Sequence, residues 1–260
     1  MTELEDRTIA ELRANHDLLA AFVADLTEVQ LKAQSGADQW SVADVLSHLG
    51  SGAEIQHHTV SRAVSGDTGD APVNQEIWDR WNALPPVEQA TEFVVSEERL
   101  VSLFESLTPE QRSSVRVDLG FLPAPVSIAT PLAMRLNEQT LHGWDARVGV
   151  DPDAVLSDEA AELVLRHYTE SMSFMLGFIG MADRLDEPVR LAVGDRVIAI
   201  EDSVALETGG EGVTTATYDG PLESVVRLMA GRLSPEHTPA AVEVTGNVTL
   251  DDLRRVFPGY

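Results

Sequence analysis

The chain has 260 residues, of which 43% are hydrophobic and 23% charged, as in ordinary soluble proteins, and it can form one large domain or two modest ones. Its 18 basic and 43 acidic residues leave a formal net charge of -25, which argues against binding to nucleic acid or to anionic lipid. The absence of cysteine excludes disulfides, cysteine-ligated zinc, iron–sulfur clusters and a cysteine nucleophile.

Apolar residues at three- and four-residue steps predict helices through the first two thirds of the chain. Residues 2–31 are expected to form one long helix. After a polar break, Ser41 is the expected N-cap of the next helix, with Asp44 in the acidic position of a capping box. Further helices are expected at 42–65, 74–83, 87–107, 127–148 and 157–181. Trp40 and Trp144 are expected to pack in the core, and Trp78 and Trp81 are also interpreted as packing residues.

The pattern changes at Pro188, where short β-branched segments replace long helical ones. Residues 189–193 and 196–200 predict a hairpin around Gly194 and Asp195. Two more strands are expected at 213–218 and 241–245, with helices at 222–230 and 249–256. The predicted fold is therefore mainly α, with a helical domain at 1–183 and a small α+β domain at 184–260.

No run of about 18 apolar residues exists, so no transmembrane helix is expected. The first residues are acidic and amphipathic, unlike a secretory signal, so we expect a cytoplasmic protein. The acidic composition is interpreted as a solubility feature, or as a high-salt or actinobacterial bias. The oligomeric state is expected to be a monomer or a homodimer.

Glu138 and His142 lie four residues apart in one predicted helix, so both side chains project from the same face. A carboxylate and an imidazole together can bind a divalent metal, and His48, from a neighbouring helix, is the best third ligand. Such a set leaves coordination positions open, as catalytic sites do. Asp145, one turn after His142, is the preferred residue to orient its imidazole, and Asp44 is a second candidate for His48.

Spacing alone leaves this metal site open, because a glutamate and a histidine four apart also occur in many helices as a solvated pair. His57 and His58 are expected at the surface. The remaining histidines, 16, 167 and 237, are assigned to the surface or to satisfied core contacts. The chain has no dinucleotide-binding, P-loop, nucleophile-elbow or zinc-protease motif.

Three segments, in the right order along the chain, carry a family likeness. QWSVADVLSHLGSGAEI (39–55) resembles the W-s-v-x-d-v-l-x-H-l segment of the mycothiol-dependent maleylpyruvate isomerases, which belong to the DinB-like metalloproteins. RLNEQTLHGWDARVG (135–149) resembles their E-x-x-x-H-x-W-D helix. VVRLMAGRLSPEH and VEVTGNVTLDDL (225–253) are similar to their C-terminal domain.

The resemblance implies a DinB-like four-helix bundle that holds a divalent metal, usually zinc, through His48, Glu138 and His142. It also implies mycothiol, a small-molecule thiol, as cosubstrate, and a small-molecule electrophile as substrate. It implicates an arginine of the C-terminal domain, which we match to Arg232. The alternative interpretation of Arg232 is a charge that complements a helix dipole. The cleft between the two domains is expected to hold the sugar portion of the thiol.

The expected chemistry is activation of the thiol as a thiolate, followed by addition to the electrophile, in a cis–trans isomerase or an S-transferase. Because few basic residues lie near the motifs, a dianionic substrate such as maleylpyruvate is disfavoured. Two alternatives remain. A non-catalytic metal-binding bundle would act as a sensor or bind a partner, and a purely structural bundle would bind no metal.

Overall fold

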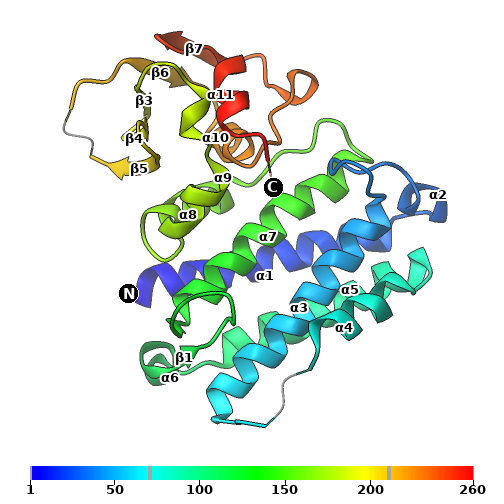
Figure 1. The fold of residues 1–260 in the computed structure, drawn as a ribbon. Helices are drawn as coiled ribbons and strands as arrows, with labels where there is room; N and C mark the ends of the chain where they lie inside the picture. Colours follow the sequence, from blue (N-terminus) through cyan, green and yellow to red (C-terminus); the bar gives the residue numbers. More distant parts are fainter. Residues whose placement is uncertain (1, 70–71, 210–211, 260) are drawn as a thin grey trace. The chain divides into compact units, whose positions relative to one another are not determined.

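The computed structural model describes residues 2–69, 72–209 and 212–259. The chain divides into two compact units, Met1–Ala154 and Val155–Tyr260 (Figure 1). The second unit therefore begins earlier than the predicted boundary between 183 and 184. The physical reason is that α8 (Asp158–Thr169) packs against α10 (Leu222–Met229) and β5 (Val204–Thr208), so this helix belongs with the sheet.

The first unit is a four-helix bundle, which confirms the predicted fold of the N-terminal part of the chain. Its long helices are α1 (Thr2–Ala24), α3 (Val42–Ser65), α5 (Pro86–Ser106) and α7 (Ala129–Val148). The packed pairs are α1 with α7, α7 with α3, α3 with α5, and α5 with α1, which closes a ring around one core. Shorter elements connect them: α2 (Glu28–Leu31), α4 (Asn74–Asn82), α6 (Pro109–Ser114), and the two-stranded ladder of β1 (Arg116–Val117) and β2 (Val126–Ser127).

Helix starts in this unit follow local capping chemistry. Ser41 and Asp44 form the predicted capping box at the start of α3, in which each side chain accepts a hydrogen bond from the other residue's backbone N–H. The single helix predicted for 2–31 is wrong: α1 ends at Ala24. Thr27 and Gln30 form a capping box of their own and start the separate helix α2.

A buried ion pair joins three helices of the bundle. Arg135 of α7 donates from Nε to Glu97 Oε1 of α5 at 2.9 Å, and its Nη2 also contacts the Glu97 carboxylate. The same Nη2 donates to the carbonyl oxygen of Leu49 in α3 at 2.9 Å. Gln139 donates to Glu97 as well, at 2.6 Å. Both charged side chains are buried, so each depends on the other for compensation.

The second unit contains a five-stranded sheet in the order β5-β4-β3-β6-β7. The predicted hairpin is confirmed: β3 (Val189–Val193) pairs antiparallel with β4 (Arg196–Ile200) through Gly194, whose φ is 57°. β3 is parallel to β6 (Ala216–Asp219), which pairs antiparallel with β7 (Glu243–Gly246). The strand β5 was not predicted. The remaining elements are α9 (Leu176–Ile179), α11 (Leu250–Val256) and the 3-10 turns 173–175, 182–184 and 235–237.

The long helix predicted for 157–181 is also wrong. α8 ends at Thr169, because Glu170 adopts φ -113° and ψ -96°, which a helix cannot continue through. The turn is closed by a hydrogen bond from the backbone N–H of Met172 to the carbonyl of His167, at 2.8 Å. Within the described residues, no helix combines the length and apolarity needed to cross a membrane.

Glu97→Ala is expected to lower the free energy of unfolding by about 3–5 kcal/mol, because the Arg135 charge would remain buried without its partner. Urea denaturation followed by circular dichroism measures this loss. Glu105→Ala, on the same helix, is the matched control: the Glu105 carboxylate is 40% exposed in its pair with Arg13, and its loss should cost about 0.2–1 kcal/mol. Equal losses for the two variants would contradict the role given to the buried pair.

Candidate metal site

His48 projects from α3, two turns after the capping box that starts the helix. Its sequence neighbours Ser47 and Leu49 are buried in the bundle, while the His48 side chain is 37% exposed. The helix therefore presents this imidazole at the edge of the core, where it remains accessible.

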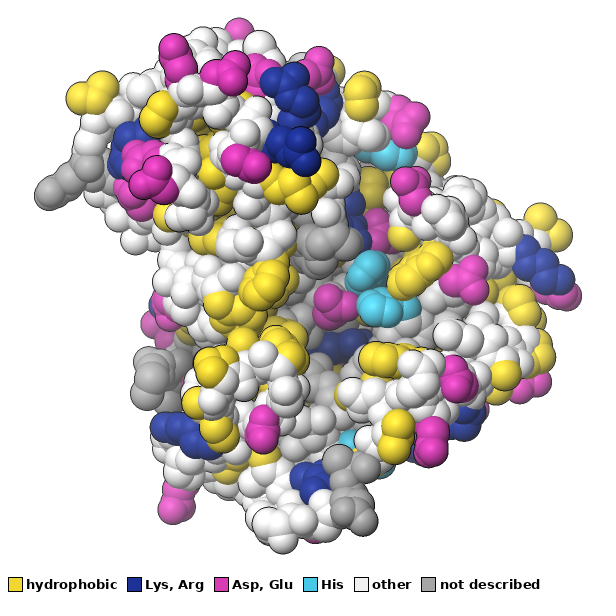
Figure 2. All heavy atoms as spheres, viewed as in Figure 1, with side chains coloured by type: hydrophobic (Ala, Val, Ile, Leu, Met, Phe, Trp, Pro, Cys, Tyr) yellow, Lys and Arg dark blue, Asp and Glu magenta, His cyan; other side chains and the backbone are white. Residues whose placement is uncertain are grey.

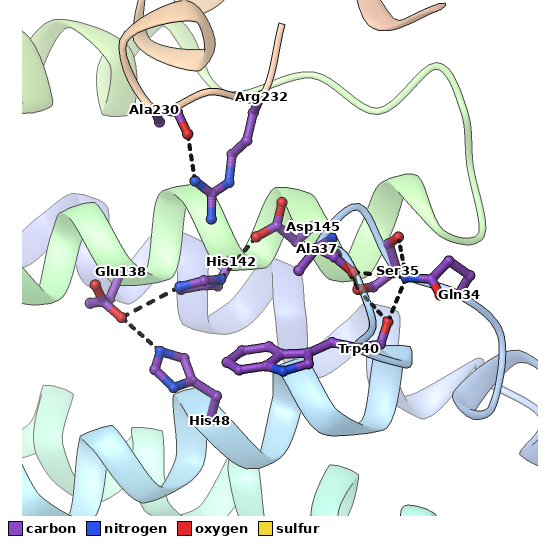
Figure 3. A network of polar contacts seen from close by, with 10 residues as sticks. All are labelled: Gln34, Ser35, Ala37, Trp40, His48, Glu138, His142, Asp145, Ala230 and Arg232. Atoms are coloured by element: carbon purple, nitrogen blue, oxygen red, sulfur yellow. Dashed lines mark hydrogen bonds and ion pairs between the residues drawn. The ribbon is translucent and has the colours of Figure 1, made fainter. Parts of the chain in front are cut away.

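Glu138 and His142 project from α7 toward His48 (Figure 3). Glu138 Oε2 lies 3.0 Å from Nε2 of His48 and 3.7 Å from Nε2 of His142. One ligand atom from each of the three residues lies within 4.8 Å of the other two. Figure 2 shows histidine side chains at the surface with an acidic side chain beside them. The structure thus brings together the three residues selected from the sequence, and no other such group of three occurs among the described residues.

The donor set fits a divalent cation. Zinc bonds of about 2.1 Å in a tetrahedron place neighbouring ligand atoms about 3.4 Å apart. The two distances from Glu138 Oε2, 3.0 and 3.7 Å, lie on either side of that value. Two imidazole nitrogens and one carboxylate suit zinc and similar ions, and three protein ligands leave room for at least one further ligand.

Electrostatics keep the Glu138 carboxylate ionised. Burial alone would raise its pKa, but the hydrogen bond with His48, the charges that His142 and His48 carry when protonated, and the charge of Arg135 lower the pKa to about 2. Nε2 of His48 lies within hydrogen-bond distance of the same carboxylate. To coordinate a cation, this nitrogen would have to offer its lone pair, so the proton of a neutral His48 would be carried on Nδ1.

Asp145 contacts the far side of the His142 ring. Its Oδ2 lies 2.9 Å from Nδ1 of His142, and the Asp145 side chain is fully buried. An ionised carboxylate only accepts hydrogen bonds, so this contact assigns the proton to Nδ1 and leaves the lone pair of Nε2 directed toward Glu138. Asp44, the second candidate, binds Ser41 in the capping box instead.

The prediction that Trp40 packs in the core is wrong. Trp40 is 36% exposed, and its ring centroid lies 5.1 Å from that of His48 and 6.0 Å from that of His142. It is the residue of this site that the sequence reasoning missed. Trp40 directly precedes Ser41, the N-cap of the helix that carries His48, and this position in the sequence could have indicated that it lies near the site. Trp144, by contrast, is buried, as predicted.

Arg232 belongs to the second unit and follows Gly231, whose φ is 72°, after the end of α10. Its Nη1 donates to the carbonyl oxygen of Ala230 at 2.9 Å. This contact is compatible with the interpretation of Arg232 as a charge at a helix C-terminus. The catalytic role remains a prediction.

Comparison with known proteins identifies the family to which the chain belongs. Residues 12–147 match the family described as mycothiol maleylpyruvate isomerase N-terminal domain. Two crystal structures are similar: that of the mycothiol-dependent maleylpyruvate isomerase, at 19% sequence identity, and that of a histidine-to-alanine mutant of it, at 18%. Each has a TM-score of 0.63 and covers 99% of this chain and 97% of the other. At this identity the likeness establishes the fold. No curated protein matches the chain.

Asp145→Asn is expected to weaken zinc binding roughly 10- to 100-fold, because a neutral amide holds the His142 proton less firmly than a carboxylate does. Competition against a chromophoric chelator measures the affinity. Asp151→Asn, at an acidic residue just beyond the end of α7, is the control and should bind zinc like the wild type. Unchanged affinity in the Asp145 variant would refute its orienting role.

Proposed function

This chain belongs to the mycothiol maleylpyruvate isomerase family, and from that premise we propose that it is a divalent-metal-dependent enzyme. It activates mycothiol for addition to an electrophilic small molecule, as a cis–trans isomerase or an S-transferase. His48, Glu138 and His142 are its metal ligands, and zinc is the proposed metal. Mycothiol is named on the strength of the family match and of the similar crystal structures, which are of a mycothiol-dependent isomerase.

One observation carries the proposal: three donor atoms from two helices converge within 4.8 Å, inside the segment that matches the family. The charge of Glu138 and the tautomer of His142 both suit cation binding. A chain without cysteine must obtain its thiol from outside, which agrees with a small-molecule cosubstrate.

A divalent cation at this site would lower the pKa of a bound thiol, so that the thiolate forms at neutral pH. The protein residues hold and orient the components. Glu138 and the two imidazoles fix the binding position, and Asp145 keeps Nδ1 of His142 protonated. The proposed role of Arg232 is to stabilise the anion that develops on the substrate.

The isomerase reaction balances without another reagent. The thiolate sulfur forms a bond to one carbon of a cis double bond, and the π electron pair moves onto the conjugated carbonyl oxygen. Rotation occurs about the resulting single bond. The electron pair then returns to form the trans double bond as the carbon–sulfur bond breaks, which releases the thiolate. In an S-transferase, the adduct takes up a proton and is kept, or another leaving group departs.

The substrate is proposed to be less anionic than a dicarboxylate. Arg135, one of the few basic residues near the motifs, is buried in its pair with Glu97 and so cannot contact substrate. The strongly acidic composition further disfavours a dianion.

His142→Ala should lose most of its bound zinc while keeping the helical circular dichroism spectrum of the wild type, because the side chain lies at the edge of the core. Elemental analysis of purified protein measures the metal. His58→Ala is the matched control: it removes a histidine of α3 that is 46% exposed and should leave the zinc content unchanged.

Activity is tested by mixing the zinc-loaded protein with mycothiol and a panel of electrophiles that includes a cis-configured unsaturated keto acid. Isomerisation with return of the thiol identifies an isomerase, and consumption of the thiol identifies a transferase. A protein that binds zinc but accelerates neither reaction would be a metal-binding bundle of the sensor or partner-binding class, and the proposal would fail.

A further inference from the structure

An indole ring lies against the metal-binding cluster without being needed to fill the core. In Figure 3 the ring of Trp40 points toward the imidazoles of His48 and His142. The Trp40 and His142 rings are stacked with an interplanar angle of 29°, and the His48 and His142 rings meet edge to face at 4.6 Å. The three rings thus form one aromatic cluster, with the indole beside the two imidazoles.

The indole is free of the contacts that anchor the two buried tryptophans. Nε1 of Trp81 donates to Glu54 at 2.9 Å, and Nε1 of Trp144 donates to the carbonyl of Ala154 at 2.8 Å. Nε1 of Trp40 has no hydrogen-bond partner within 2–69, 72–209 and 212–259. Since 36% of Trp40 is exposed, its side chain contributes less to the core than either buried tryptophan does.

The backbone around Trp40 is held firmly instead. Its carbonyl oxygen accepts hydrogen bonds from Ser35 N at 3.0 Å, from Ser35 Oγ at 2.8 Å and from Gln34 Nε2 at 3.0 Å. The preceding residue, Gln39, has a φ of 64°, the one positive value at a non-glycine among the described residues. Such a conformation is costly for glutamine, and it persists here because the surrounding hydrogen bonds determine it.

The segment is also fixed to both ligand-bearing helices. Ser41, directly after Trp40, caps α3. On the other side, the backbone N–H of Gly36 donates to the carbonyl of Asp145 in α7 at 2.8 Å. A Cβ atom at Gly36 would lie 2.7 Å from Val148, so only glycine permits this approach. The backbone of Trp40 is therefore held in place relative to α3 and α7, which carry His48 and His142.

We propose that Trp40 is a specificity-determining residue whose indole forms an apolar wall of the metal site and packs against the carbon skeleton of the electrophile. This inference rests on the proposed function. A flat aromatic surface beside the cluster favours planar conjugated electrophiles, which stack on it, over saturated and strongly hydrated ones. It also limits the approach of water from that side.

The first test needs no turnover. Cobalt(II) quenches tryptophan fluorescence at short range, so titrating the protein with cobalt should quench the emission of Trp40. Trp40→Phe should lose this component while still binding cobalt. Trp78→Phe is the matched control, because Trp78 is 41% exposed but lies on α4, and it should keep the quenching. Loss of quenching in the Trp78 variant and not in the Trp40 variant would overturn the placement of Trp40.

The second test measures selectivity. Trp40→Ala should raise KM for a planar conjugated electrophile roughly 3- to 10-fold, which is the equivalent of one lost aromatic contact. The change in kcat for this substrate should be smaller. For a small saturated electrophile, neither KM nor kcat should change. Trp40→Phe should restore most of the selectivity, and Trp78→Ala should change neither value. A residue with only a structural role would not alter the ratio between substrates.

The outcomes separate the two proposals. If the wild type binds cobalt and catalyses thiol addition, but Trp40→Ala keeps its KM values and selectivity, the role of Trp40 is refuted and the proposed function stands. If the wild type binds no metal, both proposals fail. If Trp40→Ala does not fold, Trp40→Phe carries the test through the cobalt titration, since quenching equal to that of the wild type would refute the placement of Trp40 on which the proposal rests.

Discussion

The geometry of the site depends on the buried ion pair between Arg135 and Glu97. Arg135 lies one turn before Glu138 on α7, and its guanidinium donates to the carbonyl of Leu49, the residue after His48 on α3. One buried cation therefore fixes α3 relative to α7 directly beneath the candidate ligands. Its cost of burial is offset by Glu97 on α5. Contacts among three helices of the bundle therefore set the relative positions of the three candidate ligands, which lie on α3 and α7.

Much of the site was predictable because its signals are local. A glutamate and a histidine four residues apart share a helix face, and a histidine on a packed neighbouring helix completes the set. The prediction of a maleylpyruvate isomerase-like enzyme, which rested on three motifs in order, is confirmed at the level of the family. The hairpin at 189–200 also follows from local patterns, since a Gly-Asp turn joins two β-branched segments.

Other features depend on contacts that no short pattern encodes. Hydrophobicity alone placed Trp40 in the core, whereas backbone hydrogen bonds and the unusual conformation of Gln39 hold it beside the imidazoles. The apolar run at 171–182 predicted a continuing helix, but the turn after Thr169 ends it. The start of the second unit at Val155 reflects the packing of α8 on the sheet, which the sequence pattern does not reveal.

The hydrogen bonds that hold the segment before α3 use the main chain at position 40 and the side chains of Gln34 and Ser35, and none uses the indole. The side chain at this position is therefore decoupled from the architecture that supports the imidazoles. Replacing this single residue would therefore change which molecules the protein accepts. The same replacement would have little effect on folding or on cation affinity.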